Sequence, residues 1–311
     1  MRVLITGGAG CLGASLVERF IPAGHEVLVI DNFATGKREV LPEVEGLRVV
    51  EGTIADRQLV DACFDEFVPT HVIHSAAAYK EPDDWAEDAV TNVDGTVNVV
   101  KAAERHAVRR LVYFQTALCY GRPDIVPIPV DHPLRPMTSY GVSKTAGEGY
   151  VAMSAVPWVS LRLANVTGPR LAIGPIPTFY KRLKAGQKCF CTESVRDFLD
   201  MEDFLGVMDR VLEDDAPSGV FNISTGEGHS IQEIFDLVVE HLGITLEEPV
   251  PVVPPGDDDV PAVVLDATLT GRDLGWQAKI GFRETIERML AWYDAHGVTD
   301  VFSHLKPGKP V

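Results

Sequence analysis

A tyrosine and a lysine four positions apart, Tyr140 and Lys144, are the strongest catalytic candidates in the sequence. On a helix, side chains at this spacing share one face, about 6 Å apart at Cβ. A nearby ammonium stabilises a phenolate and lowers the phenol pKa from its ordinary value of about 10. The pair could therefore supply a general base near neutral pH. The same spacing also occurs on ordinary helix surfaces, so its meaning depends on the surrounding fold.

A glycine-rich turn, Gly7–Gly13, joins the apolar run Val3–Thr6 to the helical pattern Leu12–Phe20. Glycines in such a turn let the backbone approach a pyrophosphate. The helix that follows offers free N–H groups and the positive end of its dipole. The strand, turn and helix in this order predict a dinucleotide site, with a plain glycine-rich turn as the alternative.

The second strand-like run ends at Asp31. A carboxylate at this place accepts hydrogen bonds from the adenosine ribose and repels a 2′-phosphate, which favours NAD over NADP. Lys37 and Arg38 follow closely and keep NADP open as an alternative.

Apolar runs alternate with helical patterns through the first half of the chain, which predicts an α/β fold with a Rossmann-like, doubly wound parallel sheet. The strand-like runs are Val3–Thr6, Val27–Ile30, Leu47–Val50, His71–Ala76, Leu111–Gln115 and Val159–Leu163. The helical patterns include Leu12–Phe20, Asp56–Phe67 and Val90–Arg105. Tyr140 and Lys144 then fall where the catalytic helix of a dinucleotide fold belongs.

The alternation breaks after Asn165, where Gly168, Pro169, Gly174, Pro175 and Pro177 crowd one stretch. We expect an NAD-binding domain over residues 1–165 and a smaller C-terminal substrate-binding lobe over residues 166–311, with segments near 196–225 returning to the first domain. The acidic, proline-rich segment Pro251–Pro261 is predicted to be an exposed loop, and its acids are Asp257, Asp258 and Asp259.

Composition and net charge limit the classes of molecule that this chain could bind. The 311-residue chain is 46% hydrophobic with a formal net charge of −17, which argues against nucleic acid or an anionic membrane as a partner. No apolar run approaches the roughly 20 residues that span a bilayer, and no signal-peptide pattern precedes the first strand, so we expect a cytoplasmic protein. The cysteines are predicted to be free thiols with no metal site, at Cys11, Cys63, Cys119, Cys189 and Cys191.

Several motifs joined in one chain resemble the extended short-chain dehydrogenases/reductases. They are Thr6–Gly13, His74–Ala77, Asn92–Thr96 and Tyr140–Lys144. The resemblance covers nearly the whole chain, and its later motifs are typical of the sugar-nucleotide branch, namely Leu161–Arg170, Arg196–Phe198, Phe221–Gly226 and Leu274–Trp276.

The resemblance implies the site residues. The catalytic set is Thr116, Tyr140 and Lys144. The cofactor-binding residues, besides Tyr140 and Lys144, are Gly7, Gly10, Cys11, Leu12, Gly13, Asp31, Asn32, Gly36, Thr53, Ile54, Ala76, Ala77, Ala78, Lys80 and Asn92. The substrate-binding residues, besides Thr116 and Tyr140, are Asn165, Thr178, Phe190 and Arg196.

Departures from the family pattern are also present. Lys80 is displaced by about one position, and Thr53 stands where relatives often carry an aspartate. Pro254 replaces an arginine that clamps the diphosphate in many relatives. A cationic stretch could compensate, at Lys181, Arg182, Lys184, Lys188 and Arg196.

The residues after Thr116 favour epimerisation. Dehydratases of the branch resemble one another in an acidic pair there, whereas this chain has Ala117 and Leu118. The expected reaction is a UDP-sugar 4-epimerisation, in which Tyr140 removes the 4-OH proton while C4 passes hydride to NAD⁺. The resulting 4-keto sugar turns over beside enzyme-bound NADH, and the hydride returns to its other face.

The sugar itself is expected to be UDP-glucuronic acid, converted to UDP-galacturonic acid, with Thr178, Arg170 and Thr116 as candidate donors to the carboxylate. UDP-glucose and UDP-galactose, or their N-acetyl forms, are the alternative. A reductase, dehydratase or decarboxylase on the same scaffold stays open, as does a non-catalytic NAD-sensing protein.

A homodimer is also predicted, paired through two helices as in relatives. Its apolar faces carry Val93, Val97 and Val100 on one helix, and Tyr150, Val151 and Met153 on the other.

Overall fold

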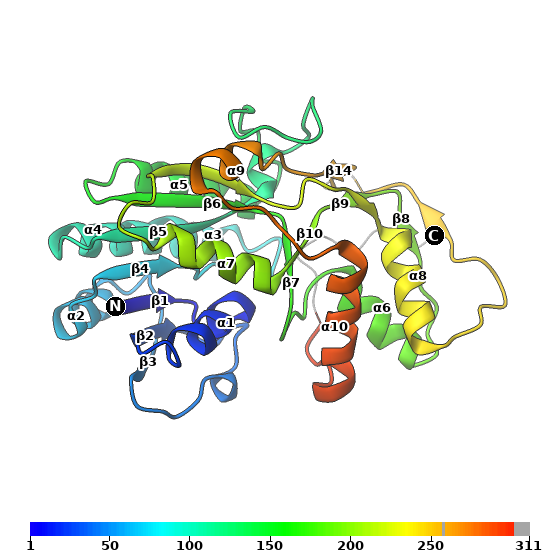
Figure 1. The fold of residues 1–311 in the computed structure, drawn as a ribbon, viewed down its shortest axis with the longest axis horizontal. Coiled ribbons are helices and arrows are strands. Elements are labelled where there is room, and N and C mark those ends of the chain that lie inside the picture. The colour runs from blue at the N-terminus through cyan, green and yellow to red at the C-terminus, as the bar shows by residue number, and fades with distance from the viewer. Residues whose placement is uncertain (257–258, 302–311) are drawn as a thin grey trace.

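The computed structural model describes residues 1–256 and 259–301, and a seven-stranded parallel sheet lies at its centre (Figure 1). The strand order is β11-β6-β5-β4-β1-β2-β3. The strands are β1 (Arg2–Thr6), β2 (Glu26–Asp31), β3 (Leu47–Glu51), β4 (His71–His74), β5 (Arg110–Thr116), β6 (Trp158–Leu163) and β11 (Gly219–Ile223). All six predicted runs form strands. The seventh strand comes from the second half of the chain.

The order of the strands locates a crevice. The chain builds β1, β2 and β3 outward in one direction, and then crosses back to place β4 on the other side of β1. In an open parallel sheet, ligands bind beyond the carboxyl ends of the strands at such a reversal. The loops after β1 and β4 therefore open onto one site.

Helices cover both faces of the sheet because alternate strand residues point to opposite sides. Val3 and Ile5 pack in one core with α1 (Cys11–Phe20) and α7 (Met201–Val211). Leu4 and Val72 pack in a second core. Its helices are α2 (Arg57–Phe67), α4 (Thr96–Arg105) and α5 (Ser139–Ala152).

The helix predicted over Val90–Arg105 is interrupted. A short α3 (Trp85–Ala89) runs into a π-helical turn, η2 (Val90–Gly95), before α4 begins. Gly95 packs tightly here, since a Cβ added to it would lie 2.6 Å from Ile54. Asn92 lies within this π-helical turn. Single π-helical turns of this kind are frequent at functional sites.

The remaining elements form a smaller lobe to the right in Figure 1 and its links to the sheet. Its core joins α6 (Pro175–Lys184), α8 (Ile231–Leu242) and α10 (Phe282–His296). Short strand pairs are β7 (Asn165–Thr167) with β10 (Phe198–Asp200), and β8 (Cys191–Thr192) with β13 (Val252–Val253). β9 (Val195–Arg196) lies between β12 (His229–Ser230) and β14 (Ala262–Val263). Single turns and a short helix complete the chain: η1 (Arg38–Val40), η3 (Ala117–Tyr120) and α9 (Thr268–Leu274).

Segments near residues 196–225 return to the large sheet. α7 packs on α1, and β11 pairs with β6 from Val159 to Leu163. α9 lies against β11, where the Thr270 hydroxyl donates to the carbonyl of Asn222 at 2.6 Å.

The prediction that Pro251–Pro261 is an exposed loop is wrong in part. The segment contains β13, and the Asp259 side chain is only 13% exposed because Arg196 and Ser194 bind its carboxylate. Asp257 and Asp258 lie outside the described residues.

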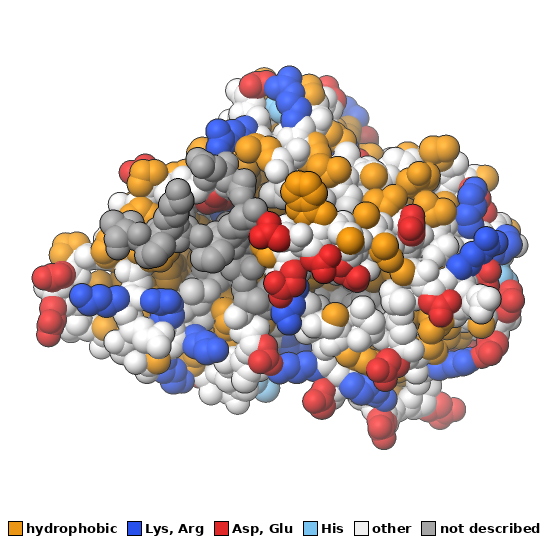
Figure 2. Space-filling view, turned by 180° about the vertical axis from the view of Figure 1, so that it is seen from behind, with side chains coloured by type: hydrophobic (Ala, Val, Ile, Leu, Met, Phe, Trp, Pro, Cys, Tyr) orange, Lys and Arg blue, Asp and Glu red, His pale blue; other side chains and the backbone are white. Residues whose placement is uncertain are grey.

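The face of the molecule turned away in Figure 1 carries side chains of mixed character. Figure 2, from behind, shows apolar side chains interspersed with acidic and basic ones. No helix in the described part of the chain combines the length and the apolar character needed to cross a bilayer.

Candidate active site

A cavity of about 980 Å³ lies beyond the carboxyl ends of the strands and extends between the sheet and the smaller lobe. Most of the predicted site residues line it together. From the cofactor set these are Gly7, Gly10, Cys11, Leu12, Asp31, Asn32, Thr53, Ile54, Ala76, Ala77, Ala78, Lys80, Tyr140 and Lys144. Thr116, Asn165, Thr178, Phe190 and Arg196 line it as well.

The turn from β1 to α1 fits a pyrophosphate. Gly7 has a φ of +70°, and a Cβ added there would lie 2.7 Å from the backbone of Ala76. An added Cβ on Gly10 would meet only the carbonyl of Gly7, at 3.4 Å, because Gly10 faces the open cavity. No side chain caps the N-terminus of α1, so the N–H groups of its first turn are available to an anion.

Asp31 is fixed in the wall beside this turn. Its carboxylate accepts the backbone N–H groups of Ala9 and Phe33, each at 2.8 Å. Burial raises the pKa of this carboxyl, and the two backbone hydrogen bonds oppose the rise. Lys37 pairs with Asp300, and Arg38 donates to a carbonyl of its own turn. The two cations are thus engaged by the protein and do not line the cavity, which favours NAD.

Three predicted cofactor residues lie behind the cavity wall. A Cβ on Gly13 would lie 2.4 Å from Gly7, and one on Gly36 would lie 2.7 Å from Ala9, so both glycines serve close packing of the loop. Asn92 is 1% exposed. Its amide exchanges two hydrogen bonds with the backbone of Ala78, each of 2.8 Å, and donates to Ser143 at 3.0 Å. Asn92 thus joins the loop after β4 to α5, the helix that carries Tyr140 and Lys144.

The three catalytic candidates come from two neighbouring elements. Thr138 caps α5 by accepting the N–H of Gly141, and Tyr140 and Lys144 follow one helical turn apart. Thr116 ends β5, and its hydroxyl accepts the N–H of Leu118 at 3.2 Å. The cap and the strand end thus place a hydroxyl, a phenol and an ammonium in the lining of the same cavity.

The expectation that Lys144 lowers the pKa of Tyr140 is wrong for the protein without its cofactor. Burial raises the pKa of the Tyr140 phenol, and Tyr79 and Asp88 add to the rise. Burial also lowers the pKa of Lys144 to about 7, against the attraction of Glu148. Desolvation therefore disfavours the charged forms of both side chains.

The substrate end of the cavity carries an unexpected acid. The Arg196 guanidinium forms an ion pair with Asp259, and Ser194 donates to the same carboxylate at 2.9 Å. Burial lowers the pKa of Arg196, and Asp259 opposes this shift. Sequence reasoning missed Asp259 because it read the segment as solvent-exposed.

Two other cationic expectations are wrong. Arg170 binds Glu18 with both terminal nitrogens, at 2.9 and 2.7 Å, so it braces the crossover against α1 instead of facing the sugar. On α6, Arg182 donates to the carbonyl of Lys188, and Lys184 donates to Tyr180. Neither Arg182 nor Lys184 lines the cavity, so Arg196 alone of the proposed cationic stretch does.

The motif around Asp197 has a structural explanation. Its carboxylate accepts the N–H and hydroxyl of Thr225 and the N–H of Gly226. This buried carboxylate joins the loop after β11 to the segment between β9 and β10. The contact fixes the wall that carries Arg196.

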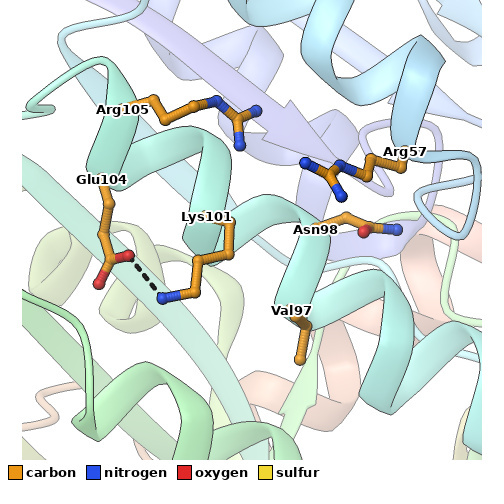
Figure 3. Close-up of a pocket in the computed structure, with 6 residues that line it drawn as sticks. All are labelled: Arg57, Val97, Asn98, Lys101, Glu104 and Arg105. Atoms are coloured by element: carbon orange, nitrogen blue, oxygen red, sulfur yellow. Dashed lines mark hydrogen bonds and ion pairs between the residues drawn. The ribbon is translucent and has the colours of Figure 1, made fainter.

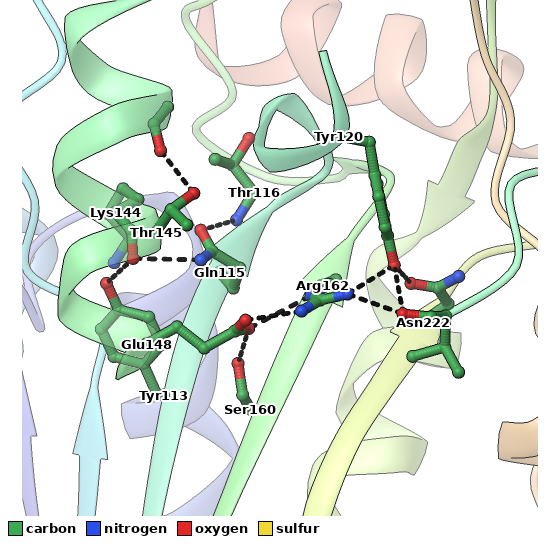
Figure 4. Close-up of polar contacts among 12 residues, drawn as sticks. Tyr113, Gln115, Thr116, Tyr120, Lys144, Thr145, Glu148, Ser160, Arg162 and Asn222 are labelled. Carbon is green, nitrogen blue, oxygen red and sulfur yellow. Dashed lines mark hydrogen bonds and ion pairs between the residues drawn. The ribbon is translucent and has the colours of Figure 1, made fainter. Parts of the chain in front are cut away.

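Between α5 and the sheet lies a buried polar network that the sequence did not suggest (Figure 4). Arg162 on β6 binds Glu148 on α5 at 2.6 Å, and Ser160 donates to the same carboxylate. Arg162 also donates to the Tyr120 hydroxyl, which donates to Asn222 on β11. The network links α5 to three segments of the chain.

A smaller pocket of about 210 Å³ lies on α4 and α2, away from these residues (Figure 3). Its cations have acidic partners, since Arg57 and Arg105 pair with Asp61 and Lys101 pairs with Glu104. It shares no lining residue with the large cavity.

Two features define the class of the short-chain dehydrogenases/reductases. They are a parallel sheet with a glycine-rich first turn, and a tyrosine and a lysine on one helix. The second lobe is typical of the extended form of this class. Within it, the chain belongs to the NAD dependent epimerase/dehydratase family, whose model matches residues 3–224. The protein is therefore an NAD-dependent epimerase of sugar nucleotides.

Known relatives resemble the chain over its whole length. The Bordetella bronchiseptica enzyme WbmG, solved in complex with NAD and UDP, is 68% identical, with a TM-score of 0.95 and 99% of both chains covered. WbmH of the same organism, in complex with NAD⁺, is 41% identical, with a TM-score of 0.90 over 96% of this chain and 99% of its own. A UDP-glucose 4-epimerase of Mycolicibacterium smegmatis is 32% identical, covering 94% of this chain and 98% of the relative.

Proposed function

We propose that this enzyme inverts C4 of a UDP-sugar through a transient 4-keto sugar. The observation that carries the proposal is the meeting of Thr116, Tyr140 and Lys144 in one cavity, between the glycine-rich turn and Arg196. The side chains after Thr116 are Ala117 and Leu118, so an elimination lacks the acid that it needs at this place. The UDP bound to WbmG supports uridine diphosphate as the nucleotide part of the substrate.

The residues act as follows. Tyr140 accepts the proton of the sugar 4-OH as C4 is oxidised, and returns it when C4 is reduced. Thr116 hydrogen-bonds the same oxygen, and Lys144 stabilises the phenolate of Tyr140. When bound, the cofactor would supply the hydride acceptor and a positive charge in its oxidised form, and the hydride donor in its reduced form. Arg196 and Asn165 hold the diphosphate end while the keto sugar turns over.

For the sugar, we propose a neutral hexose of the UDP-glucose/UDP-galactose pair ahead of UDP-glucuronic acid. Relatives at 28–32% identity named UDP-glucose 4-epimerase support this choice. Arg170, a candidate donor for a carboxylate, is engaged by Glu18. Besides Asp31 and Asp259, four further acidic residues line the cavity and oppose a uronate: Glu81, Asp84, Glu87 and Asp88.

A panel of neutral, N-acetylated and uronic UDP-sugars, followed by NMR for the C4 epimer, tests both statements. A C4-deuterated substrate should keep its label in the product, with no net cofactor reduction. Loss of the label to solvent contradicts C4 hydride transfer, and reduced cofactor formed one-for-one with product indicates a dehydrogenase. Turnover of the uronic substrate alone contradicts the choice of sugar only.

A further inference from the structure

One buried side chain contacts Lys144 at both of its ends (Figure 4). Tyr113 stands on β5 and is 0% exposed. Its ring lies under the Lys144 ammonium, with Nζ 3.9 Å from the ring centroid. Its hydroxyl donates to the carbonyl oxygen of Lys144 at 2.9 Å. The ammonium and the main chain of Lys144 are therefore set by the same residue.

A neighbour on the same strand strengthens this arrangement. Gln115 donates to the same Lys144 carbonyl at 3.0 Å, and its side-chain oxygen accepts the N–H of Thr116 at 2.8 Å. Strand β5 thus joins the substrate-side hydroxyl residue to the helical turn that carries the ammonium.

We propose that Tyr113 is a positioning residue of the epimerase, whose ring keeps the Lys144 ammonium charged and in place and whose hydroxyl fixes the turn that carries it. A cation over an aromatic face is attracted by the ring quadrupole, most strongly where water is excluded. The inference deepens the proposed 4-epimerase reaction and rests on it for its catalytic consequence.

The charges around Lys144 favour this role. On α5, the Glu148 carboxylate attracts the ammonium, and Glu148 also pairs with Arg162 of β6. On β4, burial, with a smaller contribution from the Lys144 charge, holds the pKa of His74 well below its usual value, so His74 is neutral. Asp88 of α3 acts on Tyr140. Burial lowers the pKa of Lys144 to about 7. At neutral pH, the attraction of the Tyr113 ring therefore determines how much of Lys144 is protonated.

Two variants separate the ring from the hydroxyl. Tyr113→Leu removes both, whereas Tyr113→Phe keeps the ring. The Lys144 pKa is measured directly by NMR titration of ¹³C-lysine-labelled protein, with the signal assigned by its absence from Lys144→Met. We expect the pKa to fall by roughly one pH unit in Tyr113→Leu, and by less than a third of that in Tyr113→Phe. In turnover, the alkaline limb of the pH profile should move by the same amount, with KM changed less than kcat.

Since Tyr113→Leu could fail to fold, a second series keeps the shape of the ring. Phenylalanine bearing one, two or three fluorines is incorporated at position 113, which weakens the quadrupole stepwise. The Lys144 pKa should fall with each fluorine. An unchanged pKa across this series overturns the proposal, as does an equal fall in Tyr113→Phe and Tyr113→Leu. Because the titration needs no substrate, absence of epimerase turnover would count against the proposed function alone.

Discussion

Arg162 and Glu148 form a two-contact ion pair across the buried seam between β6 and α5, with Nη2–Oε1 at 2.6 Å and Nε–Oε2 at 3.2 Å. Both side chains are less than a tenth exposed. A buried pair of this kind costs desolvation, but removing one partner leaves the other charge without compensation. The pair therefore holds the catalytic helix in register with the sheet.

Arg162→Met should lower the free energy of unfolding by about 3–5 kcal/mol. Ser160→Ala, which removes one neutral donor from the same carboxylate but leaves the ion pair intact, should cost less, about 1.5–3 kcal/mol. Urea melts of the two variants check this. A loss below about 1 kcal/mol for Arg162→Met would mean that water or a rearranged side chain satisfies Glu148.

Tyr140→Phe should lower turnover by roughly 10²–10⁴-fold, because the phenol is the proposed acid and base. The ring stays, so the fold and NAD binding should survive. Thr116→Val should cost less, since its hydroxyl only supports the sugar oxygen. Steady-state kinetics with matched circular dichroism spectra check this. A Tyr140→Phe enzyme with near-native turnover contradicts the assignment.

The stability of the cofactor-free protein should rise with pH above about 7 through Lys144. Its pKa is lowered from 10.5 to about 7 in the folded state. Between these values the unfolded chain binds the proton and the folded chain does not, so unfolding becomes less favourable as pH increases. The slope is about 1.4 kcal/mol per pH unit. Comparison with Lys144→Met isolates this slope, and equal slopes in the two proteins rule it out.

Asp31→Ala should weaken NAD binding and narrow the preference over NADP, because the variant loses an acceptor for the ribose and a charge that repels a 2′-phosphate. Calorimetric titration with both dinucleotides tests this. Arg38→Ala is a suitable control because its side chain is engaged outside the cavity. Tighter binding of NADP than of NAD by the unaltered protein would refute the role of Asp31.

The homodimer stays a prediction, and fewer of the expected interface residues are available to a partner. Val100 and Val151 are buried in the core of the chain itself, so they cannot contact a partner as first expected. Val142 and Tyr150 on α5 and Met153 directly after it are exposed at 53%, 42% and 79%. Met153→Asp should convert a dimer to monomers in light scattering at micromolar concentration, whereas a monomer before mutation contradicts the prediction.

The sequence predicted the sheet well because apolar runs such as Val27–Ile30 are buried on both faces. Strand β11 was harder to place, since its neighbour β6 lies far away in sequence. The π turn at Asn92 depends on contacts with Ala78 and Ser143, which no local pattern records.

Within the site, motif residues were predictable, whereas their charge partners were not. Asp259 acquires its role from Arg196, which lies 63 positions away in the chain, and Glu148 on α5 acquires its role from Arg162 on the next strand, β6. Arg170 shows the converse, because the same long side chain reaches Glu18 instead of the cavity. Long-range pairing of this kind depends on the tertiary structure.

The position of β11 limits how this polypeptide can be divided. A fragment that stopped at residue 165 would leave β6 with a row of unpaired backbone groups, a template for adding strands from other molecules. In the intact chain, β11 pairs with β6 and satisfies those backbone groups. The Thr270 hydroxyl then donates to the carbonyl of Asn222 on β11. Residues 1–165 therefore do not form an independent domain. Fused alone to another protein, they should aggregate, whereas a fusion that also carries β11 and α9 should remain soluble.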